Sequence, residues 1–209
     1  MKRNLFLFIL ALSVVCGMPC VSASAQVKSS FTSPDLKFFR LQGHVKQVNE
    51  TFHSTSDNGL SPFYHVSEVR FTQNGMMRIK SPKEHQVKRN KAGQIIEWVD
   101  VITYGGDEDY TSESYKYNRN GYVTTVYSSD PVQDYETYYT LNEKGWIVSE
   151  KTVTLYGGES ITETSSFSYS DIDAKGNWRK CIIVVKGRDW EKQSYTHKYT
   201  ITRKITYWE

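Results

Sequence analysis

Beyond its first 25 residues the sequence has little cysteine, alanine and leucine. Only Cys181 remains there of three cysteines, with two alanines and five leucines, whereas valine, isoleucine and threonine number 44 of 184 residues. The scarcity of good helix formers excludes a helical bundle, and the β-branched residues favour pleated sheet. A single cysteine excludes an internal disulfide, so burial and sheet hydrogen bonds must hold the fold together. Cys181 lies in an apolar run and is interpreted as a small buried hydrophobe.

The chain also lacks an excess of either charge. From Gln26 onward it has 24 lysines and arginines against 23 aspartates and glutamates. A near-neutral chain has no electrostatic footprint for DNA or RNA, so no nucleic-acid partner is expected. The 15 tyrosines and five tryptophans exclude a disordered chain.

The first 25 residues have the layout of a secretory signal peptide. Lys2 and Arg3 are followed by an apolar run over 5–15 and then by Ala23-Ser24-Ala25, which predicts cleavage before Gln26. The run is shorter than the roughly 20 residues that span a bilayer, and no later segment could form a spanning helix. A lipid anchor is not expected, because neither Cys16 nor Cys20 follows the small residue that a lipobox requires. The sequence therefore predicts an exported protein, periplasmic or extracellular.

The rest of the chain repeats itself with an offset of 52 residues. The matched positions are Gly93 and Gly145, Ile95 and Ile147, Val101 and Val153, Tyr104-Gly105-Gly106 and Tyr156-Gly157-Gly158, and Tyr117 and Tyr169. A weaker copy beginning at Gly43 precedes both. Self-similarity at a fixed spacing is typical of repeat architectures, so about three units of roughly fifty residues are predicted.

A shorter turn motif recurs inside these units. Its best instance runs over 115–123, where apolar residues alternate, Asn118 opens a turn and Gly121 closes it. Asn or Asp accepts hydrogen bonds from the backbone that follows, and glycine takes the positive φ before the return strand. Five such turns predict a meander of antiparallel strands. The turn glycines are Gly75, Gly93, Gly121, Gly145 and Gly176.

The stretch 115–123 resembles the YD repeat of the RHS family, with Asn118 in place of the usual Asp. The opening 41–50 and the tail 175–178 are similar to segments of small secreted RHS-like proteins of Bacteroidota type. The resemblance spans 41–185 and implies an all-β sheet built from hairpins. It implies no catalytic residues, because the motif is structural, and the chain is too short for the enclosing shell of full RHS proteins.

We predict one all-β domain over 41–209, preceded by a loose lead-in over 26–40 from which Phe38, Phe39 and then Leu41 dock onto the sheet. Twelve strands in one flat open sheet would curl or split, so a strongly curved sheet or a two-layer sandwich is expected. The predicted strands are 44–53, 63–72, 76–80, 84–89, 94–104, 110–118, 122–128, 134–141, 146–156, 161–170, 177–186 and 192–207.

The sequence offers no catalytic set, no metal site and no cofactor motif. The five histidines lack the spacing of zinc ligands and are interpreted as surface or turn residues. Nucleophile elbows and phosphate-binding glycine loops are missing. Two carboxylates suited to glycoside hydrolysis need not be close in sequence, and nothing singles out a pair.

The aromatic residues are the one feature that points to binding. Tyrosine and tryptophan give contact area at low entropy cost, although they also suit cross-strand pairs in a sheet. The candidate ligand-binding residues, expected as exposed aromatics, are Trp98, Trp146, Trp178 and Trp190.

These observations favour a non-enzymatic exported module that binds or scaffolds an envelope partner, either a glycan, a peptide or an envelope protein. One alternative is a small outer-membrane β-barrel, suggested by strand number and signal peptide, although no outward apolar face persists through successive strands. A second alternative is a hydrolase acting on polysaccharide, supported only by the predicted compartment.

Overall fold

The computed structural model describes residues 31–55, 64–79, 85–104 and 107–209, and the predicted signal peptide lies outside these ranges. The described chain consists of one short helix and eleven strands. They are α1 (Pro34–Phe38), β1 (Val45–Thr55), β2 (Tyr64–Arg70), β3 (His85–Arg89), β4 (Ile95–Tyr104), β5 (Asp107–Tyr117), β6 (Val123–Ser129), β7 (Asp134–Leu141), β8 (Ile147–Tyr156), β9 (Glu159–Ile172), β10 (Trp178–Arg188) and β11 (Ser194–Tyr207).

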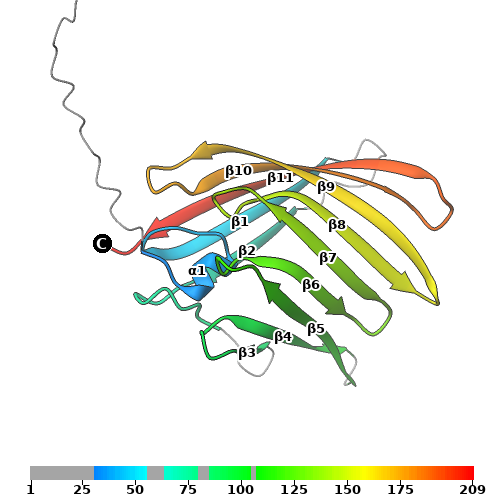
Figure 1. Cartoon of the computed structure of the whole chain (residues 1–209), viewed down its shortest axis with the longest axis horizontal. Coiled ribbons are helices and arrows are strands. Elements are labelled where there is room, and N and C mark those ends of the chain that lie inside the picture. The colour runs from blue at the N-terminus through cyan, green and yellow to red at the C-terminus, as the bar shows by residue number, and fades with distance from the viewer. Residues whose placement is uncertain (1–30, 56–63, 80–84, 105–106) are drawn as a thin grey trace, which may run out of the picture.

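All eleven strands form one antiparallel sheet in the order β2-β1-β11-β10-β9-β8-β7-β6-β5-β4-β3. The sheet is strongly curved, with β2 and β3 at its two edges and α1 inside the curve (Figure 1). The predicted all-β meander is therefore confirmed, as a curved single sheet. The prediction of a strand over 76–80 is wrong for the described residues 76–79, where Met77 forms a single isolated bridge to Phe71. The chain leaves the β2 edge at this point, because it has to reach β3 at the opposite edge.

The five predicted turn glycines all adopt the left-handed conformation, with φ between 73° and 87°. At the third turn the Gly121 amide donates to the Asn118 carbonyl at 3.0 Å. The Asn118 side-chain oxygen accepts from the amides of Asn120 and Tyr122, both at 3.0 Å. Asparagine thus satisfies the amides that the turn leaves unpaired, and glycine takes the φ that a side chain disfavours.

One hydrogen bond repeats with the 52-residue offset found in the sequence. The Tyr117 hydroxyl donates to the Ile95 carbonyl at 2.5 Å, and the Tyr169 hydroxyl donates to the Ile147 carbonyl at 2.8 Å. Each tyrosine spans from near the end of one strand to the start of the strand immediately before it. The internal repeat is therefore a repeat of contacts as well as of residues.

A further turn of the same geometry has lysine where the others have glycine. Between β10 and β11 the Asp189 side chain accepts from the Gln193 amide at 2.8 Å, and the Lys192 amide donates to the Asp189 carbonyl at 2.9 Å. Lys192 has φ 65°. The glycine pattern could not predict this turn, because the left-handed position is filled by a residue with a Cβ.

The described part of the lead-in, from Phe31 onward, is more ordered than expected, since it contains the helix α1. Ser33 caps the helix by accepting from the Leu36 amide at 3.1 Å, and its hydroxyl donates to the Gly75 carbonyl at 2.7 Å. Lys37 donates to the Asn120 carbonyl at 2.9 Å. Just after the lead-in, the Gln42 amide donates to the Asn177 side-chain oxygen at 2.8 Å. The lead-in therefore binds several of the glycine turns and fills one end of the curved sheet.

Asp35 in the first turn of α1 joins the two edges of the sheet. Its carboxylate is fully buried, accepts from the Met77 amide at 2.6 Å and pairs with the Arg89 guanidinium at 2.5 and 2.9 Å. Met77 follows β2 at one edge, whereas Arg89 ends β3 at the other. One carboxylate thus holds the two edges together at the α1 end.

The core is divided into two clusters. The first joins the lead-in to β1 and the hairpin after β2, and the expected docking of Phe39 and Leu41 is confirmed there. The second lies further along the sheet and contains Cys181, confirmed as a buried apolar residue. The buried members of the first cluster are Leu36, Leu41, Val45, Val48 and Phe71, and those of the second are Trp146, Trp178, Cys181 and Ile183.

Replacement of the buried carboxylate tests this description. Asp35→Asn should lower the free energy of unfolding by about 3 kcal/mol, because it leaves the Arg89 charge without its partner in a buried site. The control Asp171→Asn removes an exposed ion pair with Arg179 and should cost under about 1 kcal/mol. Urea denaturation of both variants measures the difference, and equal losses would contradict the role of Asp35.

The lysine turn gives a second prediction. Lys192→Gly should raise the free energy of unfolding by about 0.5–1 kcal/mol, because glycine accepts a positive φ without steric cost. Lys192→Ala removes the same side chain but keeps the strain, and should leave stability unchanged or slightly lower. Thermal unfolding of both variants decides, since equal melting temperatures would show that backbone strain is not the cause.

Candidate ligand-binding pocket

The concave face of the sheet is polar as well as apolar. Cys181 and Ile183 are buried at alternate positions of β10, and they mark this face. Strand pairing sets Val185, two residues further along, beside Ser165 of β9 and sets Ser165 beside Glu150 of β8. Carboxylates and hydroxyls therefore line the inside of the curve, where their hydrogen bonds must be made within the protein.

A pocket of about 400 Å³ lies between the two edges of the sheet and is bounded on one side by the lead-in. Its apolar residues come mainly from the lead-in and the segment after β2, and its polar residues come mainly from β3 to β6. The apolar residues are Phe38, Phe39, Val69, Met77 and Ile79; the others are Glu68, Arg78, His85, Trp98, Asp100, Thr111, Glu113, Tyr115 and Ser128.

Two carboxylates organise the polar side of this pocket. Asp100 Oδ1 accepts from His85 Nδ1 at 2.7 Å and from Trp98 Nε1 at 2.5 Å. Glu113 Oε2 accepts from the Tyr115 hydroxyl. Burial, followed by the Glu113 charge, raises the pKa of Tyr115 far above its usual value, so the phenol remains a proton donor. These bonds fix the orientation of both aromatic rings.

Two arginines support the sheet beside the lead-in. The buried Arg203 guanidinium pairs with Glu50 at 2.6 Å and stacks on the Trp178 ring at 3.6 Å from its centroid. Arg40 lies over the Tyr139 ring at 5.3 Å. Burial lowers the pKa of both guanidinium groups.

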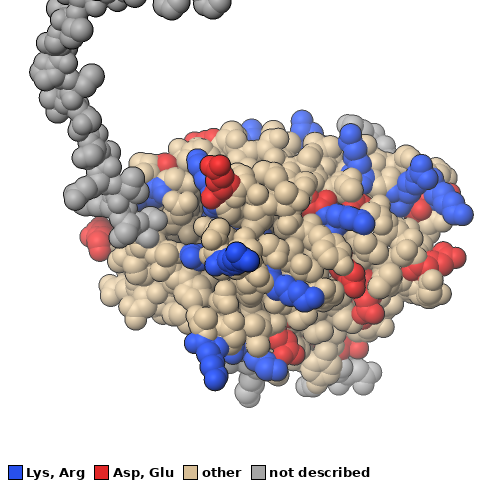
Figure 2. Space-filling model, in the orientation of Figure 1, with Lys and Arg blue, Asp and Glu red and all other residues tan. Residues whose placement is uncertain are grey.

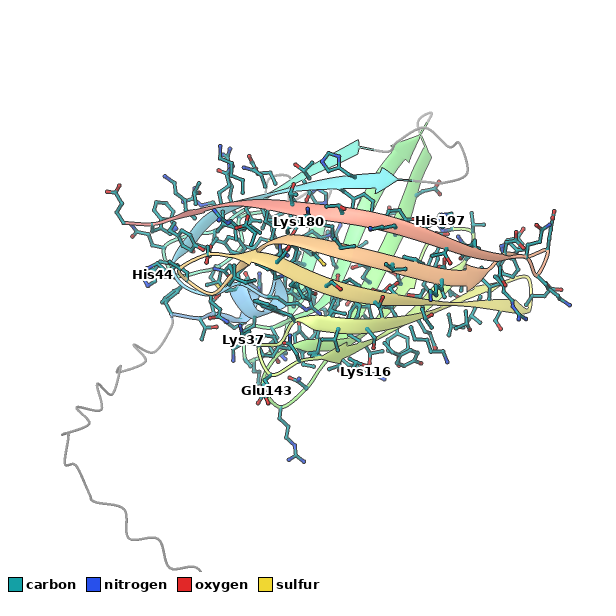
Figure 3. All side chains as sticks on the ribbon, turned by 90° about the horizontal axis from the view of Figure 1, so that it is seen from above. Lys37, His44, Lys116, Glu143, Lys180 and His197 are labelled. Carbon is teal, nitrogen blue, oxygen red and sulfur yellow. The ribbon has the colours of Figure 1, made fainter. Side chains whose placement is uncertain are left out.

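Side chains fill this end of the molecule near Lys37 and His44, whereas His197 lies further towards the other end (Figure 3).

The four predicted tryptophans separate into different environments. Trp98 lines the pocket, and Trp190 is 43% exposed. Trp146 and Trp178 are each 5% exposed and belong to the second core cluster, so their prediction as exposed aromatics is wrong. Each directly follows a turn and packs against Tyr169, at 5.1 and 5.2 Å between ring centroids. Packing on the concave face has buried them.

Trp190 belongs to a separate groove at the far ends of β9, β10 and β11. The groove has a volume of about 650 Å³ and is lined by Trp190, Tyr195 and several charged residues. Tyr156 packs beside Trp190 at 6.0 Å between ring centroids. This groove is a second location at which an aromatic surface meets solvent.

The polar pocket residues were not predicted as a site. His85 was interpreted as a surface or turn histidine, and Asp100, Glu113 and Tyr115 were not singled out. Alternation alone places Trp98 with Asp100 on one face of β4 and Glu113 with Tyr115 on one face of β5. That signal was present in the sequence, but it did not show which face is concave.

The remaining chemistry is limited. Within the described ranges, no three His, Cys, Asp or Glu side chains gather closely enough to hold a metal ion. Burial raises the pKa of Cys181 to about 11, so the thiol is protonated at neutral pH. Positive and negative side chains are interspersed over the face shown in Figure 2. No helix in the described part of the chain is both long and apolar enough to cross a bilayer.

Known proteins show little similarity to this chain. No protein-family model matches the chain, and no curated protein does. Among solved structures, a porin-like protein from Bacteroides uniformis ATCC 8492 is 13% identical over 78% of this chain and 96% of that one, with a TM-score of 0.28. Such a score carries no argument about fold or function.

Glu150 gives a prediction about pH. Burial raises the pKa of this carboxyl, which accepts from Ser165 at 3.1 Å and Thr152 at 3.5 Å. A raised pKa in the folded state favours the protonated form, so stability is lost as pH rises through the folded pKa. Glu150→Gln keeps the shape and both bonds without the charge.

We expect Glu150→Gln to unfold with a free energy close to that of the wild type near pH 4 and with a clearly larger one near pH 8. Chemical denaturation across this range measures the difference. Glu136→Gln on the same sheet, whose carboxylate accepts from Tyr138 in an exposed position, is the control and should show no growing difference. A constant gap between Glu150→Gln and wild type at every pH would contradict the prediction.

Proposed function

We propose that this protein is an exported, non-enzymatic binding module of the cell envelope, and that its ligand binds in the pocket between the two sheet edges. The observation that carries the proposal is the pocket itself. Its volume of about 400 Å³ is within the range of small-molecule sites, which are usually concave, mainly apolar and supplied with a few fixed polar groups.

The polar groups of the pocket are held in place before any ligand arrives. Asp100 is fixed by His85 and Trp98, and Glu113 is fixed by Tyr115. Preorganised side chains lose little conformational entropy on binding, which favours affinity. The ordered lead-in also contributes, because Phe38 packs edge-on against the Tyr115 ring at 4.9 Å.

Export and the family relationship support the proposal from the sequence side. The predicted signal peptide would place the module in the envelope, where glycans, peptides and envelope proteins are available as partners. The turn motif supports membership of the small RHS-like proteins, which we also propose for this chain. Neither argument identifies the ligand.

A paired-variant experiment tests the location of the site. A panel of glycans, envelope peptides and small metabolites should contain a ligand that raises the melting temperature of the wild type and of Trp190→Ala. The same ligand should not change the melting temperature of Trp98→Ala, because that variant loses one wall of the pocket and one hydrogen-bond partner of Asp100. Circular dichroism establishes that both variants are folded.

Two outcomes would overturn the proposal. Binding that survives Trp98→Ala but disappears in Trp190→Ala would place the site in the far groove. Release of reducing ends from a polysaccharide, abolished by Glu113→Gln, would instead establish the hydrolase alternative. That alternative has one supporting observation, namely that Asp100 and Glu113 line the same pocket.

A further inference from the structure

Two carboxylates of the pocket each have an oxygen without a hydrogen-bond partner among the described residues. Asp100 receives both of its hydrogen bonds on Oδ1, and Glu113 receives its bond on Oε2. Among the described residues, nothing donates to Asp100 Oδ2 or to Glu113 Oε1. Each carboxylate is therefore fixed through one oxygen and keeps the other available to a donor inside the pocket.

Strand register brings these two carboxylates together. Trp98 pairs with Glu113, and Asp100 pairs with Thr111, so Asp100 and Glu113 occupy diagonal positions on the same face of β4 and β5. Diagonal neighbours are about 7–8 Å apart, which is within reach of a single group that donates to both side chains. Two carboxylates this close attract a cation more strongly than either does alone.

The rest of the lining fits a cation with an apolar body. The rings of Trp98 and Tyr115 lie beside the carboxylates, and aromatic faces attract ammonium and guanidinium groups. Apolar side chains from the lead-in and from the segment after β2 provide surface for the rest of the ligand. The pocket thus combines an acidic side with an apolar side.

The other charged groups of the pocket already have a protein partner or face solvent. Glu68 forms an ion pair with Arg70 at 2.9 Å. Arg78 is exposed, and His85 is already bound to Asp100. Asp100 and Glu113 therefore face the pocket against one solvent-exposed arginine, Arg78, so the charge of the lining is complementary to a positive ligand.

We propose that the pocket selects a small apolar or aromatic molecule carrying a primary amine, with the ammonium group bound between Asp100 and Glu113. This inference rests on the proposed function, because it names the ligand class for the same pocket. A primary amine is favoured over a quaternary one, since the available oxygens need N–H donors. A neutral hydroxyl would make weaker hydrogen bonds to the same oxygens.

Three probes with one aromatic body and different charges test the inference. They are 2-phenylethylamine, 2-phenylethanol and 3-phenylpropanoic acid, each titrated against the purified protein by ligand-observed NMR. We expect the amine to bind at least about tenfold more tightly than the alcohol, with the acid weakest. Glu113→Gln and Asp100→Asn should each remove most of the preference of the amine over the alcohol.

The control variant is Glu163→Gln. Glu163 also faces the concave side and accepts from a tyrosine hydroxyl, that of Tyr195, but it does not line the pocket. This variant should keep the full preference for the amine. A preference lost equally in Glu163→Gln would show that the general charge of the concave face, not the pocket pair, selects the ligand.

The outcomes separate this inference from the proposed function. If amine and alcohol bind equally and both are lost in Trp98→Ala, the pocket is a binding site but the preference for a cation is wrong. If none of the three probes binds, the inference is overturned, while the ligand panel described above still decides whether the pocket binds anything. If the acid binds best, the charge argument is reversed.

Discussion

The buried carboxylate of Asp35 is the contact on which the rest of the molecule depends. An open sheet of eleven strands has two edges, and nothing in its hydrogen-bond ladder brings them together. Asp35 does so at one end, because it binds the backbone just after β2 and the guanidinium at the end of β3. The pocket is made of residues from both sides of this junction, so its walls face each other only while the junction holds.

The second constraint is that the concave face carries polar groups that must be satisfied internally. Tyrosine serves this purpose, since its ring fills space and its hydroxyl reaches a partner. Tyr117 and Tyr169 donate to backbone carbonyls, whereas Tyr115 and Tyr195 donate to carboxylates. The unusual tyrosine content is therefore explained largely by the interior of the curve.

Local features of the fold could be predicted, whereas those that depend on curvature could not. In four of the five predicted turns an Asn or Asp is followed three residues later by glycine, and in the remaining one Thr72 stands three residues before Gly75. All five turns are present, with the glycine in the left-handed conformation. The turn at Lys192 has no glycine to mark it in the sequence. Its left-handed backbone conformation is held by the hydrogen bonds that Asp189 accepts. Helix α1 had a signal in Ser33 and the following proline, but five residues give too little periodicity. Val69 of β2 and Trp98 of β4 line the same pocket only because the bending of the whole sheet brings its two edges towards each other.

The pairing of β1 with β11 joins segments separated by most of the chain, as the bond from Arg203 to Glu50 across 153 residues illustrates. Loop closure of this length is slow compared with the formation of the consecutive hairpins. The hairpins from β3 to β11 can assemble in order, and β1 can pair with β2, but this pair can join the sheet only through β11. A newly made chain would thus keep the β1–β2 hairpin apart from the rest of the sheet until β11, the strand between them, has been made.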